Sequence, residues 1–407
     1  MTFGFSVVLE TAPGSTAACP TGSCHTEMAV TKCAAGKVRP KVRRMDLEAQ
    51  KGPKMRPKVQ NVDLEAQERT GPSARTGGNR PERMRYIRIV HSAHFYYLCA
   101  MNEREIYFAG GCFWGVEHFF KGVDGVTEVT PGYANGHTDA PTYRQVYTDT
   151  TGFAETVRVR YRPEKVSLER LVRLFFAIID PLSVNQQGHD VGTRYRTGVY
   201  YIDPAQVQVI APVFAEVAAG LGAKSPGPGL ATELEPLRNF YPAEEYHRDY
   251  LDKNPEGYCH LPLKAFRYLR LCQDLPLLLG DEPDPVARMA EAAALIHERM
   301  HFFWTGFYSV KDEQLVLGPF QGPAACFRIG YGKGVCGTAW ARRERVVVPD
   351  VEAFPGHIAC SSLSRSEIVV PVIRSGEVVA VLDIDSKELD TFDRIDAAFL
   401  ELMVASL

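Results

Sequence analysis

The stretch Ala109-Gly110-Gly111-Cys112-Phe113-Trp114-Gly115 marks the transition from a predicted strand to a predicted helix. An apolar run at residues 106–108 precedes it and indicates a strand, and apolar residues recur at helical spacing after it. The two glycines suit the tight turn between these elements. Cys112 therefore lies in the first turn of the helix, where unpaired N–H groups and the helix dipole favour a thiolate. Phe113 and Trp114 add an apolar wall, so the stretch predicts a reactive thiol beside an apolar pocket.

Length and composition exclude several classes of protein. The 407 residues are enough for about two to three domains. The net charge of −3 combines a basic segment, residues 31–88, with an acidic remainder, which argues against a nucleic-acid partner for the folded part. No uncharged apolar run reaches the roughly 18 residues of a membrane span, so no membrane association is expected.

The ten cysteines are spread too widely for a small disulfide scaffold, and no two of them have Cys-x-x-Cys spacing. No Cys/His group has the spacing of a zinc site, so no metal is expected. Cysteines that are neither scaffold nor ligand suggest redox chemistry in a reducing compartment. We therefore expect a cytoplasmic protein, while the few early acidic residues leave organellar targeting by an N-terminal extension open.

Residues 1–100 are predicted to be a disordered, basic N-terminal extension. A polar, proline-containing unit at residues 39–50 returns in similar form at residues 56–67, and two copies of such a unit cannot bury a core. Organised sequence begins at Met101, so a functional start at that residue is one hypothesis.

Residues 102–262 alternate strands with helices, which predicts an α/β domain. Alternating apolar residues indicate a strand over residues 156–161. Apolar residues follow the i, i+3, i+4 rule over residues 168–179 and predict an amphipathic helix. A second strand over residues 199–202 and a second helix over residues 204–219 are predicted next.

Five motifs in this domain resemble the A-type peptide methionine sulfoxide reductases. They are the Cys112 stretch, Pro141-Thr142-Tyr143, Gly152-Phe153-Ala154-Glu155, residues 189–196 (His-Asp-Val-Gly-Thr-Arg-Tyr-Arg) and residues 253–259 (Lys-Asn-Pro-Glu-Gly-Tyr-Cys). The resemblance covers nearly all of the domain and implies a ferredoxin-like α/β sandwich. It departs at Phe153, where the family usually has histidine, and at Arg194, where it usually has glutamine.

The resemblance implies a thiol reaction on a sulfoxide, whose sulfur is electrophilic and whose oxygen leaves only after it gains protons. Cys112 is implied as the attacking thiolate and Glu155 as the acid, which needs a raised pKa to act near neutral pH. The implied supporting residues are the hydrogen-bond donors Tyr143 and Tyr195, nearby Asp190, and Phe113 and Trp114 around the substrate methyl group. Cys259 is implied to condense with the resulting sulfenic acid into a disulfide, which thioredoxin would reduce, and no cofactor is expected.

Residues 263–283, rich in leucine and proline, are predicted to be a linker to a second domain at residues 284–407. A helix precedes two β-rich runs, residues 367–373 and 377–384, which are joined by the hairpin signal Ser375-Gly376. The chain then closes on an amphipathic helix. This pattern predicts an α+β domain with a central antiparallel sheet.

Motifs in the second domain resemble the GAF-fold free methionine-(R)-sulfoxide reductases. The matching positions are Cys326, Cys336, Cys360, residues 364–371 and residues 382–385. The resemblance implies Cys360 as the nucleophile and either Cys326 or Cys336 as the resolving thiol. It departs at Ser361, where the family usually has aspartate.

Three carboxylates and two aromatic residues of this domain fit a small zwitterionic substrate. Glu367, Asp383 and Asp385 are predicted to bind the free amino group and to donate a proton to the oxide. Carboxylates this close together should raise the pKa of one of them. Trp304 and Tyr308 are predicted to line a pocket for the methyl group.

The two resemblances together predict a fused enzyme that reduces both epimers of methionine sulfoxide. The first domain would reduce the S-epimer, free or in proteins, and the second would reduce the free R-epimer. One alternative is that the GAF-like domain is a non-catalytic sensor of a small ligand, against which its three motif cysteines argue. A general thiol–disulfide oxidoreductase is a further alternative, which the lack of Cys-x-x-Cys disfavours.

Overall fold

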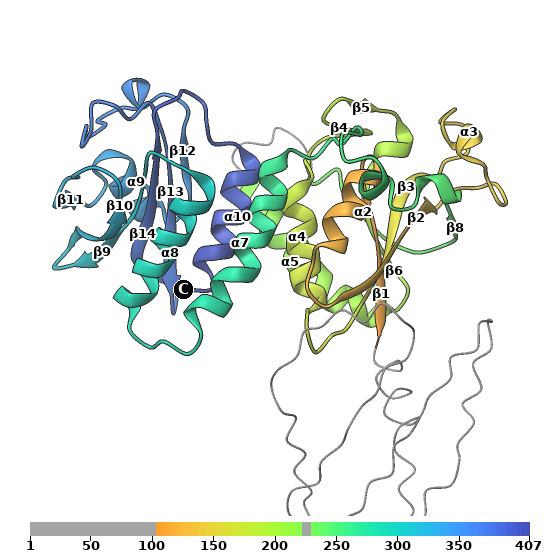
Figure 1. Ribbon diagram of the computed structural model, residues 1–407, viewed down its shortest axis with the longest axis horizontal. Coiled ribbons are helices and arrows are strands. Elements are labelled where there is room, and N and C mark those ends of the chain that lie inside the picture. The colour runs from red at the N-terminus through yellow and green to blue at the C-terminus, as the bar shows by residue number, and fades with distance from the viewer. Residues whose placement is uncertain (1–102, 222–228) are drawn as a thin grey trace, which may run out of the picture. The chain divides into compact units, whose positions relative to one another are not determined.

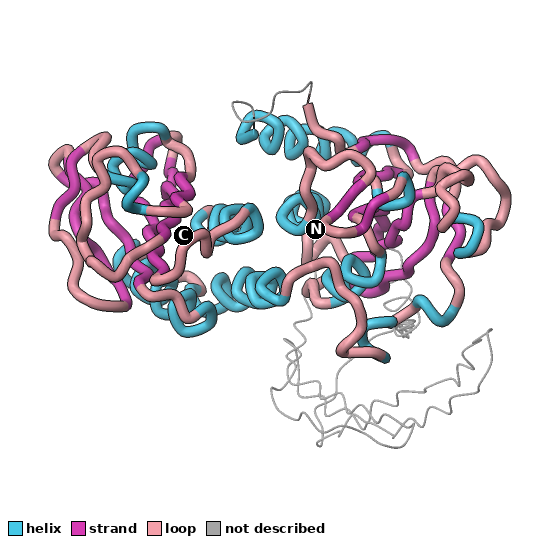
Figure 2. The backbone as a smooth tube through the Cα atoms, turned by 90° about the horizontal axis from the view of Figure 1, so that it is seen from above, coloured by secondary structure: helices cyan, strands magenta, loops and turns pink. Residues whose placement is uncertain are grey.

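The computed structural model describes residues 103–221 and 229–407 (Figure 1). The predicted extension at residues 1–100, its repeat and the start at Met101 lie outside the described residues. The described part contains two six-stranded sheets, each flanked by helices, which correspond to the two predicted domains (Figure 2).

The first sheet has a ferredoxin-like core, as predicted. Helix α2 (Phe113–Lys121) connects β1 to β2, and helix α4 (Leu168–Ile178) follows β3. Neighbouring strands are antiparallel except the β6–β7 pair, which is parallel. The strand order is β7 (Glu233–Pro236), β6 (Thr197–Tyr201), β1 (Arg104–Gly110), β3 (Ala154–Tyr161), β2 (Val126–Ala134), β8 (Phe240–Pro242). The inner order β6-β1-β3-β2 is the one that defines this sandwich.

Helix α4 forms where the periodicity predicts it. The Ser167 hydroxyl caps its start by accepting a hydrogen bond from the Arg170 N–H at 3.1 Å. Leu171, Val172 and Phe175 recur on one face and are fully buried against the sheet. The Phe175 ring stacks on Phe108 of β1, with ring centroids 4.9 Å apart.

Helix α5 (Pro204–Leu221) is the one helix among the described residues that is long and apolar enough to match a membrane span. Glu216 interrupts its apolar run and pairs with Arg173 of α4 at 2.7 Å. Ile210 and Val213 are buried in the domain core. These contacts are those of a helix that packs on a neighbouring helix of the sandwich.

Short elements supply much of the surroundings of Cys112. They are α3 (Tyr143–Val146), β4 (Gln186–Gln187), β5 (Asp190–Val191), the 3₁₀ turns η1 (Thr193–Tyr195) and η2 (Glu245–His247), and α6 (Tyr250–Lys253).

Most of residues 263–283, predicted as a linker, is helix α7 (Leu263–Leu279). Its buried residues other than Leu271 recur at helical spacing: Ala265, Tyr268, Leu269, Cys272, Leu275 and Leu279. The leucine- and proline-rich composition concealed this periodicity. The helix packs against α8 (Pro285–Met300) and α10 (Arg394–Val404), so the segment is part of the folded core.

The second sheet is entirely antiparallel, as predicted for an α+β domain. Ser375 and Gly376 both have positive φ values, which is the geometry of the predicted two-residue hairpin. Helix α9 (Gly334–Arg342) and the turn η3 (Val351–Ala353) complete the domain with α8 and α10. The strand order is β11 (Arg328–Gly330), β10 (Gln314–Gln321), β9 (Trp304–Lys311), β14 (Glu377–Ser386), β13 (Ser366–Arg374), β12 (Val346–Val348).

Helix α10 of the second domain packs on helices α4 and α7. Asp396, which is 2% exposed, accepts hydrogen bonds from Lys264 at 2.6 Å and from the Tyr268 hydroxyl at 2.9 Å. Arg394 donates to the carbonyl oxygens of Phe176 and Ala177 near the end of α4. The largest apolar cluster contains buried side chains of both domains.

Candidate active sites

Cys112 lies at the N-cap of α2, directly after the strand-to-helix turn. Gly111 has a φ of +84°, and a Cβ atom there would lie 2.7 Å from Gln187 Cβ, so the turn requires glycine. The thiol of Cys112 is buried, with 6% of the residue exposed. The predicted strand, turn and helix are all present, and they place this sulfur just beyond the C-terminal end of the inner strand β1.

The pKa of Cys112 is raised well above its usual range, contrary to the expectation of a favoured thiolate. Burial is the largest cause, and the nearby Glu155 carboxylate is the next. The helix start works in the opposite direction, since the Trp114 N–H lowers the pKa of the thiol. Desolvation outweighs the helix terminus here, so the resting thiol is protonated.

Glu155 lies on β3 and is 1% exposed. Its Oε2 atom accepts a hydrogen bond from the Phe113 N–H at 3.1 Å. Burial raises the pKa of Glu155 to about 8, against the lowering effects of that N–H group and of Arg194. The expected raised pKa is therefore present, and the carboxyl group is mostly protonated at neutral pH.

Tyr143 and Tyr195 lie close enough to Glu155 for its charge to act on both phenols. Burial raises the pKa of both phenols, and Glu155 is the next cause for each. Both hydroxyl groups therefore remain hydrogen-bond donors. Tyr143 begins α3, and its N–H donates to Glu244 at 2.8 Å, while Tyr195 ends η1. Asp190 on β5 is close enough to raise the pKa of Cys112.

An aromatic wall lies behind Cys112, as predicted from Phe113 and Trp114. Trp114 stacks on Tyr250 with ring centroids 3.7 Å apart, and its Nε1–H donates to His247 Nδ1 at 3.1 Å. Phe113 is 5.0 Å from the His247 ring and 5.9 Å from the Tyr133 ring, measured between centroids. The wall is thus fixed by both stacking and a hydrogen bond.

Cys259 lies against the first turn of α2. A Cβ atom at Gly115 would lie 3.1 Å from Cys259 Sγ and 3.1 Å from two atoms of the His260 ring. His260 Nε2 is 3.1 Å from the Gly110 carbonyl oxygen. Glycine at position 115 therefore allows the Cys259 segment to approach within one helical turn of Cys112.

The two departures from the reductase family have different surroundings. Arg194 is buried, pairs with Asp149 at 2.5 Å, and places its guanidinium 4.2 Å from the Tyr147 ring and 4.4 Å from the Tyr195 ring. Arg194 is therefore part of the site wall, which the sequence did not predict. Phe153 is buried and packs edge-on against Tyr241, which is an ordinary core contact.

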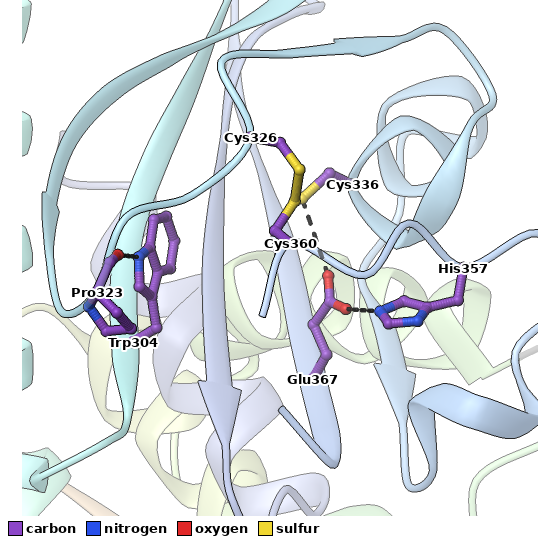
Figure 3. The surroundings of a disulfide bond; sticks show 7 residues. All are labelled: Trp304, Pro323, Cys326, Cys336, His357, Cys360 and Glu367. Carbon is purple, nitrogen blue, oxygen red and sulfur yellow. Dashed lines mark hydrogen bonds and ion pairs between the residues drawn. A yellow bond between two sulfur atoms is a disulfide. The ribbon is translucent and has the colours of Figure 1, made fainter. Parts of the chain in front are cut away.

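The second site is a cavity in the GAF-like domain. Cys326 and Cys360 form a disulfide beside it (Figure 3). Cys336 lies in the first turn of α9 and is not joined to another described residue. The cavity is lined by all the predicted carboxylate and aromatic residues of this domain, together with Cys336, Cys360 and Ser361.

The three carboxylates lie on neighbouring strands, with Glu367 of β13 opposite Asp385 of β14. Burial raises the pKa of Glu367 and Asp383 well above the usual range, with further contributions from the neighbouring aspartates. Burial also raises the pKa of Asp385 to about 6. The expected raised pKa is therefore found, and it extends to all three groups.

Trp304 and Tyr308 lie four positions apart on one face of β9, and both are buried. Their ring centroids are 6.0 Å apart, and Trp304 Nε1–H donates to the Pro323 carbonyl oxygen at 3.0 Å. His357 Nε2 lies 3.8 Å from Glu367 (Figure 3). Ser361 Oγ accepts from the Leu363 N–H at 3.2 Å, which stabilises the loop that carries Cys360.

A family model described as peptide methionine sulfoxide reductase matches residues 104–273. The peptide methionine sulfoxide reductase MsrA of Clostridium acetobutylicum is 50% identical over 164 residues, which cover 40% of this chain and 98% of that protein. The MsrA of Lachnoclostridium phytofermentans is 49% identical over 164 residues, which cover 40% of this chain and 96% of that protein. The chain belongs to the peptide methionine sulfoxide reductase family.

A second family model, described as GAF domain, matches residues 284–407. A solved structure of free methionine-R-sulfoxide reductase from Neisseria meningitidis, in complex with its substrate, is 50% identical. That match covers 34% of this chain and 84% of that chain, with a TM-score of 0.34. The reductase thus joins a methionine sulfoxide reductase domain to a GAF domain, which confirms the predicted combination. The first match extends to residue 273, within α7 and past the predicted boundary at 262.

Besides Arg194, three further site residues of the reductase were not predicted from the sequence. His247 and Tyr250 contact Trp114 but lie more than 130 positions later, in a stretch that gave no motif. His357 lies three positions before the predicted nucleophile Cys360, and a histidine so close to that cysteine was a usable signal.

Proposed function

We propose that the first domain reduces the S-epimer of methionine sulfoxide, free or in proteins, by thiol chemistry at Cys112. The sulfur of Cys112 bonds to the sulfoxide sulfur, and the substrate oxygen leaves as water once Glu155 has protonated it. Water then attacks the Cys112 sulfur and breaks the S–S bond, which releases the thioether and leaves Cys112 as a sulfenic acid. The balance is one thiol and one sulfoxide converted to one sulfenic acid and one thioether. The hydrogen bond between Glu155 and the residue after Cys112 supports this proposal, because it fixes the acid beside the nucleophile.

The raised pKa values of the thiol and the acid suit this reaction. Glu155 is protonated at neutral pH and so can donate to the oxide oxygen. The Cys112 proton must leave as the S–S bond forms, and the sulfoxide oxygen is a base that gains protons in the same step. Tyr143 and Tyr195 would donate hydrogen bonds to that oxygen, and Asp190 would support them from β5. Phe113 and Trp114 would surround the methyl group.

Cys259 would then reduce the sulfenic acid. Its thiol displaces water from oxidised Cys112, which gives a disulfide and one water molecule. The position of Cys259 against Gly115 supports this role. An external dithiol such as thioredoxin would reduce the disulfide by thiol exchange, so the cycle would require no cofactor.

The second domain would reduce the R-epimer of free methionine sulfoxide. Cys360 would attack the sulfoxide sulfur and Cys326 would resolve the sulfenic acid, which the disulfide between them supports. Cys336 would stay reduced among the carboxylates. Glu367, Asp383 and Asp385 would bind the substrate ammonium group and supply the proton, and Trp304 and Tyr308 would line the methyl pocket.

The rival function for the second domain is ligand sensing, which the match to the GAF model favours. The two functions are distinguished in the full chain, because α10 packs on α7 and an isolated fragment would lose that contact. A Cys112→Ser chain is assayed with free methionine-(R)-sulfoxide and a dithiol, beside Cys112→Ser/Cys360→Ser. Turnover by the first protein alone supports the reductase, and equal absence of turnover supports the sensor.

A further inference from the structure

One thiol and two carboxylates converge in the interior of the GAF domain. Cys336, Glu367 and Asp383 are 3%, 6% and 7% exposed. Their Sγ and carboxylate oxygen atoms all lie within 4.8 Å of one another. The Cys336 Sγ atom is 3.9 Å from Glu367 Oε1 (Figure 3). Three groups that can each become anionic thus share one buried position.

A second observation shows that one oxygen atom at this position lacks a hydrogen-bond partner. The Oδ1 atom of Asp383 is buried and accepts no hydrogen bond from any described residue. A buried acceptor without a donor is costly, and a carboxylate more so. Among the described residues, no lysine or arginine pairs with Glu367 or Asp383, and His357 is the one ion-pair neighbour of Glu367. The buried Oδ1 atom of Asp383 is therefore left for a ligand other than the described side chains.

We propose that Cys336, Glu367 and Asp383 form a binding site for a divalent cation that accepts sulfur ligands, such as Zn²⁺. A tetrahedral Zn²⁺ with Zn–S and Zn–O bonds of about 2.3 and 2.1 Å separates sulfur from oxygen ligands by roughly 3.5 Å. The 3.9 Å between Cys336 Sγ and Glu367 Oε1 needs a shift of a few tenths of an ångström. The other pairs of ligand atoms lie within 4.8 Å and need a shift of at most about 1.3 Å. A mixed sulfur and oxygen donor set suits Zn²⁺ rather than Mg²⁺ or Ca²⁺, which take oxygen ligands.

The cation competes with the proposed substrate and is not a cofactor. The same three residues line the cavity beside Cys360, where the substrate ammonium group would bind. Zn²⁺ bound at Cys336, Glu367 and Asp383 therefore inhibits reduction of the R-epimer. This inhibition rests on the proposed function of the second domain, whereas binding of the cation does not.

The test measures binding of Zn²⁺ and Co²⁺ to the full chain. All proteins carry Cys112→Ser, which removes the other thiol-containing group of potential ligands, Cys112, Asp190 and His260. Cys336→Ser is compared with Cys272→Ser, a matched control because Cys272 is also a buried free thiol. We expect Cys336→Ser to lose one equivalent of Zn²⁺ in equilibrium dialysis and the sulfur–Co²⁺ absorption band, and Cys272→Ser to keep both.

Equal binding by the two serine variants overturns the proposal. Thermal melts report whether Cys336→Ser is folded. Glu367→Gln and Asp383→Asn provide the test if it is not, because each should raise the Co²⁺ Kd roughly tenfold or more, and an unchanged Kd overturns the site. The experiment measures binding and not activity. A chain that binds Zn²⁺ but does not reduce the R-epimer would therefore refute the proposed function of the second domain and leave the metal site standing.

Discussion

The Oε2 atom of Glu155 accepts a hydrogen bond from the N–H of Phe113, 3.1 Å away, and Phe113 is the residue directly after Cys112. This contact joins the third strand of the first domain to the start of its first described helix. It fixes a carboxyl group beside the buried thiol, and burial keeps that group protonated to about pH 8.

Activity toward methionine-(S)-sulfoxide should fall as the pH rises through about 8, because ionised Glu155 cannot protonate the oxide. Glu155→Gln should lower kcat/KM by about 10²- to 10⁴-fold, since the proton donor is lost. The measurement is kcat/KM against pH for both proteins. The assignment of Glu155 as the acid would be contradicted if Glu155→Gln kept the same decrease in kcat/KM at alkaline pH, or if it kept full activity.

The same group makes stability depend on pH. Folded Glu155 keeps its proton to about pH 8, whereas the unfolded chain releases it near its ordinary pKa. The folded state thus binds more protons in this window, so the free energy of unfolding should decrease as the pH rises from about 4.5 to 8. Denaturant titrations should show a smaller decrease in Glu155→Gln than in the parent chain.

Arg194→Gln should move the alkaline limb of the pH profile to higher pH. The guanidinium lowers the pKa of Glu155, so its removal lets the acid keep its proton longer. Arg194→Lys is the matched control, because it retains the positive charge but loses the planar contact with Tyr147 and Tyr195. The electrostatic role of Arg194 would be refuted if the pH at which activity falls were unchanged in Arg194→Gln, or if it were lower.

Gly115→Ala should slow formation of the Cys112–Cys259 disulfide by about tenfold. Its Cβ atom would press on Cys259 and His260, and such overpacking costs about 1–3 kcal/mol. In a single turnover, the rate of methionine release reports the step at Cys112 and should stay unchanged. The rate at which free thiols disappear reports disulfide formation and should decrease. Gly220→Ala is the control, since it is also a helical glycine and has no atom within 4 Å of the added Cβ. Slowing of both steps alike would show a general distortion instead.

Asp396→Ala should lower the free energy of unfolding by about 3 kcal/mol. The substitution removes a buried carboxylate that bonds Lys264 and Tyr268 of α7, and loss of one partner of a buried charged pair typically costs ~3–5 kcal/mol. Urea titrations followed by circular dichroism measure the change. Asp274→Ala is the control, because its pair with Arg299 is distant and exposed, and a change below about 1 kcal/mol is expected. Equal effects of the two variants would contradict the role of α10 in joining the domains.

The fold of each domain was largely predictable from local patterns. The periodicity over residues 168–179 and the signal Ser375-Gly376 correspond to helix α4 and to the β13–β14 hairpin. Helix α7 was not predicted, since its proline- and leucine-rich sequence is typical of a connector. Its burial depends on contacts such as Tyr268 with Asp396, which are 128 positions apart.

The site residues that lie in short motifs were predictable from the sequence. Properties that depend on contacts between distant parts of the chain were less predictable. The sequence left Cys326 and Cys336 as alternatives, and the structure pairs Cys326 with Cys360. The helix-start rule predicted an acidic Cys112 thiol, but it does not include the burial that raises the pKa. The roles assigned to the individual site residues stay predictions until they are measured.

The most direct test of the two-site account is disulfide mapping after a single turnover with each epimer. The fully reduced chain is mixed with one equivalent of methionine-(S)-sulfoxide or of methionine-(R)-sulfoxide, blocked with an alkylating reagent, and digested for mass spectrometry. The account predicts Cys112–Cys259 with the S-epimer and Cys326–Cys360 with the R-epimer. Formation of the same disulfide with both epimers, or of neither, would contradict it.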